Sequence, residues 1–194
     1  MSLLNLQKND ILDLTKKDPS LNNIILAGGW DVVKRGFFNL GAADLDLDLS
    51  ALLLDENDKL LGNEGIIYFG NQRGQGIFLH GDNRTGEGYG DDERISISLS
   101  NLPSNCKKVI FSVNIYEAQK RRQDFSKVKN AYVRILNCDK GNTEICRYNL
   151  SEDGQNATSL IFAELYKENS EWNFRAVGQL LQGTLTTLVN QYRY

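Results

Sequence analysis

The chain has 194 residues, 41% of them hydrophobic, and a formal net charge of −3. This length and composition suffice for a sizeable core, and we expect a single domain over residues 1–194. The N-terminus lacks the basic and apolar segments of a signal peptide, and no stretch approaches the roughly 18 apolar residues of a membrane span. The sequence therefore predicts a cytoplasmic protein without membrane insertion. The acidic balance argues against nucleic acid as a partner.

Most apolar segments are short, rich in β-branched and aromatic residues, and bounded by Gly, Asn or Asp, which is typical of β-strands. In chain order, the predicted strands span residues 23–32, 43–54, 65–70, 76–80, 93–100, 108–116, 131–137, 143–150, 159–166 and 172–179. Residues 117–128 predict a short helix or a crossover, and residues 182–192 predict a terminal amphipathic helix. The pattern favours an all-β fold, an antiparallel two-sheet β-sandwich with a short C-terminal helix.

The segment DLDLDLS at residues 44–50 alternates aspartate with leucine. In a strand, this alternation places the leucines on one buried face and the aspartates on the other. The leucines are Leu45, Leu47 and Leu49, and the aspartates are Asp44, Asp46 and Asp48. Successive aspartates would lie roughly 6–7 Å apart and repel each other, and aspartate is depleted in strands. Three of them in alternation favour a bound divalent cation over an ordinary solvated face.

The segment GDNRTGEGYGDDE at residues 81–93 holds five acids, four glycines, one arginine and no aliphatic side chain. Its glycines predict a sharply bent loop. Carboxylates, the Asn83 amide, the Thr85 hydroxyl and freely bending backbone carbonyls are hard oxygen donors. That donor set suits calcium better than zinc or copper, and better than magnesium, which prefers a few carboxylates plus waters.

Other loop motifs fit this segment less well. An EF-hand would need glycine where Glu87 stands, and a helix rather than a strand after the loop. GDNRTG has the glycine spacing of a P-loop, but Glu87 also takes the place of the essential lysine. GNQRGQG at residues 70–76, with Arg73, is a better anion candidate, although a plain hairpin connection is the favoured interpretation.

The sequence contains weak signals for catalysis. The single histidine, His80, precedes the acidic loop, and no motif places a serine or cysteine beside it. The three cysteines, Cys106, Cys138 and Cys146, form no CxxC pair, and we expect reduced thiols. The enzymatic alternative is a metal-dependent phosphoester or nucleotide hydrolase. A cage filled by protein oxygens leaves no open coordination position, so a calcium-binding module without catalytic residues is favoured.

Five segments carry a family resemblance: GWD at 29–31, DLDLS at 46–50, the acidic loop at 81–93, RYNLSED at 147–153, and FAELY with WNFRAVGQ within 162–179. In this order they resemble the TerD-domain family of tellurite-resistance and general stress proteins, and the resemblance covers nearly the whole chain. It implies a calcium-binding β-sandwich with two ions, in a cytoplasmic protein of a bacterial stress operon with other stress-operon proteins as partners. Carried over by position, it implies a metal set of Asp31, Asp46, Asp48, Asp82, Asn83, Gly88, Asp91, Asp92 and Glu93.

Overall fold

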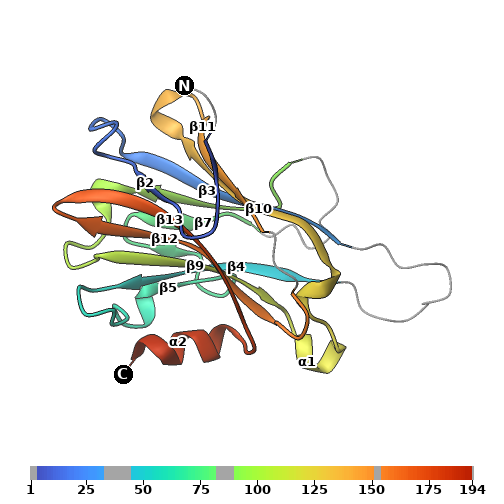
Figure 1. Ribbon diagram of the computed structural model, residues 1–194. Coiled ribbons are helices and arrows are strands. Elements are labelled where there is room, and N and C mark those ends of the chain that lie inside the picture. The colour runs from blue at the N-terminus through green and yellow to red at the C-terminus, as the bar shows by residue number, and fades with distance from the viewer. Residues whose placement is uncertain (1–3, 33–44, 82–89, 151–153, 194) are drawn as a thin grey trace.

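Two β-sheets dominate the computed structural model, which describes residues 4–32, 45–81, 90–150 and 154–193 (Figure 1). Within these residues, sheet A has seven strands in the order β1-β11-β10-β3-β8-β7-β6, and sheet B has six in the order β2-β13-β12-β9-β4-β5. Of the strand pairs described, only β1 with β11 is parallel. The predicted antiparallel two-sheet sandwich is confirmed.

The strands and helices have the following bounds. Sheet A consists of β1 (Leu4–Leu6), β3 (Asn23–Val32), β6 (Arg73–Gly74), β7 (Ile77–Leu79), β8 (Glu93–Ser98), β10 (Val128–Asn137) and β11 (Thr143–Asn149). Sheet B consists of β2 (Ile11–Asp13), β4 (Leu47–Leu54), β5 (Ile66–Ile67), β9 (Lys108–Ile115), β12 (Ser159–Glu168) and β13 (Glu171–Leu181). The α-helices are α1 (Ala118–Arg121) and α2 (Leu185–Arg193), and short 3₁₀ helices cover Asn63–Gly65, Leu99–Asn101, Phe125–Lys127 and Cys138–Lys140.

Each predicted strand segment overlaps an observed strand, and β3 has the predicted bounds. The strand predicted from residue 43 begins at Leu47, with residues 43 and 44 outside the described part. The predicted short helix and terminal helix are α1 and α2. Strands β1, β2 and β6 were not predicted, because each has at most three residues and forms by pairing with a neighbouring strand.

The hydrophobic core fills the space between the two sheets. Leu45, Leu47 and Leu49 are at most 6% exposed and belong to this core, as their alternation with aspartate predicts. Helix α2 lies along the outer face of sheet B, where Leu188 and Val189 join a second buried cluster (Figure 1). Neither α-helix of the described residues is long and apolar enough to cross a membrane. All three cysteines are free thiols, as expected.

Ile95 in β8 is fully buried, whereas Ile11 in β2 is 55% exposed. The free energy of unfolding should therefore depend far more on Ile95 than on Ile11. We expect Ile95→Ala to lower the free energy of unfolding by about 2–5 kcal/mol, because a cavity remains where the side chain was. Ile11→Ala is the matched control and should cost at most about 0.5 kcal/mol. Urea denaturation measures both, and equal losses would contradict the described packing.

Candidate functional site

Asp92 immediately precedes β8 and is fixed to β3 by its main chain and its side chain. Its N–H donates to the Gly28 carbonyl at 2.8 Å, and its Oδ2 accepts from the Trp30 N–H at 2.8 Å. The residue is buried, and this desolvation raises the pKa of its carboxyl; the charges of Asp31 and Asp91 also raise it, whereas the Trp30 hydrogen bond lowers it. A nearby cation would relieve the cost of keeping this carboxylate ionised.

Glu93, the first residue of β8, links sheet A to sheet B. Its Oε2 accepts from the Leu49 N–H in β4 at 2.7 Å, and the residue is only 3% exposed. Strand β5 pairs with β4 at Ala51 and Leu52, two positions further along the strand. The Glu93 carboxylate therefore satisfies a buried backbone donor that β5 does not reach.

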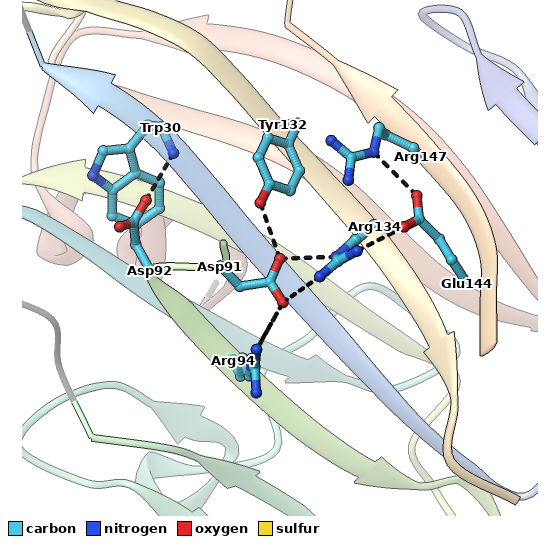
Figure 2. Close-up of polar contacts among 8 residues, drawn as sticks. All are labelled: Trp30, Asp91, Asp92, Arg94, Tyr132, Arg134, Glu144 and Arg147. Carbon is cyan, nitrogen blue, oxygen red and sulfur yellow. Dashed lines mark hydrogen bonds and ion pairs between the residues drawn. The ribbon is translucent and has the colours of Figure 1, made fainter. Parts of the chain in front are cut away.

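Asp91 lies on the outer face of sheet A, where its side chain is fully buried beneath two arginines and a tyrosine (Figure 2). Its Oδ1 accepts from Arg134 Nε at 2.8 Å and from the Tyr132 hydroxyl at 3.0 Å. Its Oδ2 accepts from Arg134 Nη2 at 2.9 Å and from Arg94 Nε at 3.2 Å. Burial and the neighbouring Asp91 raise the pKa of Tyr132 to about 12, so its hydroxyl remains a donor near neutral pH.

Two further residues extend this arrangement into β11. Arg134 Nη1 donates to Glu144 Oε2 at 2.7 Å, and Arg147 Nε donates to Glu144 Oε1 at 3.0 Å. The Arg147 guanidinium lies 4.1 Å from the centre of the Tyr132 ring. The contacts thus form a closed circuit through Asp91, Arg134, Glu144, Arg147 and Tyr132, which we call the Asp91 circuit. Hydrogen bonds to Asp91 and Glu144 raise the pKa of Arg134, so its charge is permanent.

Gly29 makes room for the Asp91 circuit. It pairs with Tyr132 across β3 and β10, and a Cβ added at Gly29 would lie 2.5 Å from the Tyr132 ring and hydroxyl. With only hydrogen there, the ring lies over β3 and its hydroxyl reaches Asp91. The glycine of the predicted GWD segment therefore has a structural role in placing Tyr132.

The remaining predicted ligands lie on other elements. Asp31, at the end of β3, is exposed and accepts from the Asn130 amide at 2.7 Å. Asp31 and Asp92 line one cavity of about 430 Å³, together with Arg147. Asp46 faces Arg121, with 3.9 Å between Oδ2 and Nη1.

Asp48 lies in β4 between the buried leucines, on the opposite face of the strand, and pairs in register with Asn114 of β9. The structure thus brings Asp31 and Asp92 into one cavity and sets Glu93 against β4. Asp48 lies on the face of β4 opposite the core leucines, and Asp46 immediately precedes that strand. Among the described residues, no group of three or more His, Cys, Asp or Glu side chains is placed to hold a metal ion. Asp82, Asn83 and Gly88 lie outside the described residues, as does Asp44.

His80 has a structural environment on sheet A. Its Nε2 lies 2.6 Å from the Ser96 hydroxyl, and its ring packs edge-on against Phe78 with 4.7 Å between ring centres. Burial, and secondarily the charge of Arg94, lower the pKa of His80, which favours the neutral ring. The glycine-rich segment at 70–76 contains the start of the β6–β7 hairpin, as expected, and its Arg73 stacks on Phe78.

These features define an antiparallel β-sandwich with consecutive anchored carboxylates where β8 begins. The chain belongs to the TerD domain family, which matches residues 1–192. It is 43% identical to "Tellurium resistance protein TerD" of Serratia marcescens over 191 residues, which cover 97% of this chain and 96% of that relative. It is 41% identical to "General stress protein 16U" of Bacillus subtilis (strain 168) over 191 residues, with the same coverage of each chain.

Among solved structures, the fold matches a homologue of telluride resistance protein (TerD) from Streptomyces coelicolor A3(2). The TM-score is 0.69 at 20% sequence identity, over 88% of this chain and 96% of the other. At that identity the match supports the fold.

The contact between Gly29 and Tyr132 predicts a difference between two adjacent glycines. Gly29→Ala should lower the free energy of unfolding by about 1–3 kcal/mol, because the new methyl group displaces a ring held in the Asp91 circuit. At Gly28, an added Cβ would meet its nearest atom, on Trp30, at 3.4 Å, which is an ordinary contact. Gly28→Ala should therefore be neutral or slightly stabilising, since alanine restricts the unfolded chain. Thermal melts of the two variants check this, and equal destabilisation would contradict it.

Proposed function

We propose that this TerD-domain protein is a calcium-binding stress-response module in which the ion stabilises the fold or its contacts with partner proteins. The observation that carries the proposal is the Asp92 carboxylate, which is buried, has a raised pKa, and shares a cavity with Asp31 at the end of the acidic loop. Burial penalises the Asp92 charge, and the neighbouring Asp31 repels it, so a bound cation would stabilise this pair beyond what the nearby Arg147 supplies.

The donor chemistry supports calcium over softer metals. The predicted residues that the structure describes offer carboxylate oxygens, and calcium takes about six to eight oxygen ligands in flexible geometry. Asp31 and Asp92 would hold an ion from sheet A, and Asp46 and Asp48 would contribute from sheet B. Two pairs of aspartates at different strands are compatible with the two ions that the family resemblance implies. When bound, calcium would supply positive charge that offsets repulsion among these carboxylates.

A binding role is also consistent with the names of the relatives. The curated relatives are named for tellurium resistance and general stress, and neither name specifies a reaction. We therefore propose a cytoplasmic protein whose calcium-loaded form contacts other proteins of the stress response. The surface used for those contacts would be ordered by the ion.

Calcium should raise the melting temperature of metal-stripped protein. A ligand at one hundred times its dissociation constant adds about 2.7 kcal/mol to the free energy of unfolding. For a chain of this size that corresponds to a rise of roughly 5–10 °C. Differential scanning calorimetry with calcium and with a chelator measures the shift. Identical melting curves in the two conditions would refute calcium binding to the native state.

Asp92→Asn should shrink the calcium-dependent part of that shift, because a charged oxygen ligand becomes neutral. In chelator, the same variant should be as stable as wild type or slightly more stable, because a buried charge is removed. The matched control is Asp58→Asn: Asp58 is exposed, pairs with Lys108, and has φ 58°, which asparagine tolerates. This control should keep the full calcium response, and an equal loss in both variants would point to general charge rather than ligation.

We expect no turnover of phosphomonoesters or nucleotides with calcium or magnesium. In the described structure His80 contacts Ser96 and Phe78, so its ring is held by packing contacts rather than presented to a substrate. A substrate screen at neutral pH tests the expectation. Turnover that His80→Ala abolishes while calcium affinity is retained would instead establish the metal-dependent hydrolase.

A further inference from the structure

Asp91 has no remaining acceptor capacity for a metal ion. An ionised carboxylate offers about four lone-pair sites on its two oxygens. Asp91 receives four donors at 2.8–3.2 Å: the Tyr132 hydroxyl, two nitrogens of Arg134, and Arg94 Nε. Its side chain is fully buried under these groups. Direct coordination of a cation would require at least one of these bonds to break.

The surrounding charge also opposes a cation at Asp91. Arg134 and Arg94 both contact its carboxylate, and a divalent ion bound to the same oxygens would lie close to both guanidinium groups. The Asp91 circuit further fixes Arg134 through Glu144, so that arginine cannot move aside without losing a second ion pair. The electrostatics therefore favour Asp91 as a partner of arginine.

The two following acids differ from Asp91 in direction and in partners. The Asp92 carboxylate turns toward Trp30, away from the Asp91 circuit (Figure 2). The Glu93 carboxylate reaches Leu49 on sheet B. In the contacts described above both accept from backbone N–H groups, whereas Asp91 accepts from two arginines and the Tyr132 hydroxyl. Holding Asp91 in place therefore fixes where the next two residues leave the loop and enter β8.

We propose that Asp91 is a positioning residue of the calcium site and not one of its ligands. Through Arg134, it anchors the end of the acidic loop to the outer face of sheet A, and this anchor sets the positions of Asp92 and Glu93. The inference rests on the proposed calcium binding and corrects the ligand set that the sequence predicts, removing Asp91 from it.

The first test compares charge-conserving variants by calorimetric calcium titration. Arg134→Lys keeps the positive charge but loses the planar fork that holds both Asp91 oxygens, so we expect calcium affinity to fall about tenfold. Arg73→Lys is the control, because Arg73 stacks on Phe78 of the same sheet and contacts none of the three acids; its affinity should equal that of wild type. If Asp91 were a ligand, Arg134→Lys would free its oxygens, and unchanged or tighter binding would overturn the proposal.

The second test uses wild-type protein and does not depend on whether a variant folds. Carboxyl carbon resonances of assigned aspartates are followed by NMR as calcium is added. The Asp92 resonance should shift on binding while the Asp91 resonance stays in place, because a positioning residue keeps its partners. A calcium-dependent shift of Asp91 as large as that of Asp92 would overturn the proposal.

A calcium-free experiment separates this inference from the proposed function. In chelator, Asp91→Asn and Arg134→Lys should each lower the melting temperature, and the double variant should lower it by less than the sum, because one interaction is lost in all three. Additive losses would refute the anchor. Failure of wild type to bind calcium in the titration would instead refute the proposed function, whatever the outcome of this cycle.

Discussion

Asp91, Asp92 and Glu93 are three consecutive carboxylates whose side chains are removed from water, and the arrangement of this part of the sandwich follows from the need to pair each of them. Unpaired buried charge is among the most unfavourable features a fold can contain. Each carboxylate finds its partner on a different element: Asp91 on β10, Asp92 on β3, and Glu93 on β4. The start of β8 is therefore fixed in three directions at once.

This pairing also explains several residue choices nearby. Gly29 lacks a side chain so that Tyr132 can cross β3 and reach Asp91. Arg134 is an arginine because its planar fork bonds Asp91 with two nitrogens while a third bonds Glu144, which lysine could not do in the same geometry. These residues hold the end of the acidic loop in place through Asp91, and they lie on the outer face of sheet A.

The sequence predicts the sandwich well because burial governs its strands. The alternation of leucine and aspartate before and within β4 indicates which face of the strand is buried. The apolar run at residues 23–32 predicts the observed bounds of β3. Strands β1 and β2 escape prediction because tertiary pairing, rather than local pattern, makes three residues a strand. The Asp91 circuit escapes for a related reason: Tyr132 and Arg134 alternate with buried Val133 and Ile135, which looks like any solvated face, and Asp91 is more than forty residues away in the chain. The available signal was the combination of tyrosine and arginine on β10 with Glu144 and Arg147 on β11, but only strand pairing reveals that they meet.

The origin of these partners in distant strands has a consequence for stability. The end of the acidic loop can adopt its described contacts only when β3, β8 and β10 have paired, because Asp91 bonds to Arg134 of β10 and Asp92 bonds to Trp30 of β3. The energy of the loop's contacts is thus coupled to assembly of the whole sheet. A ligand that binds the carboxylates in this arrangement would discriminate between the folded and unfolded chains, since the unfolded chain has no comparable geometry. Its effect would therefore appear as a cooperative shift of the global unfolding transition, and not as local ordering of one loop.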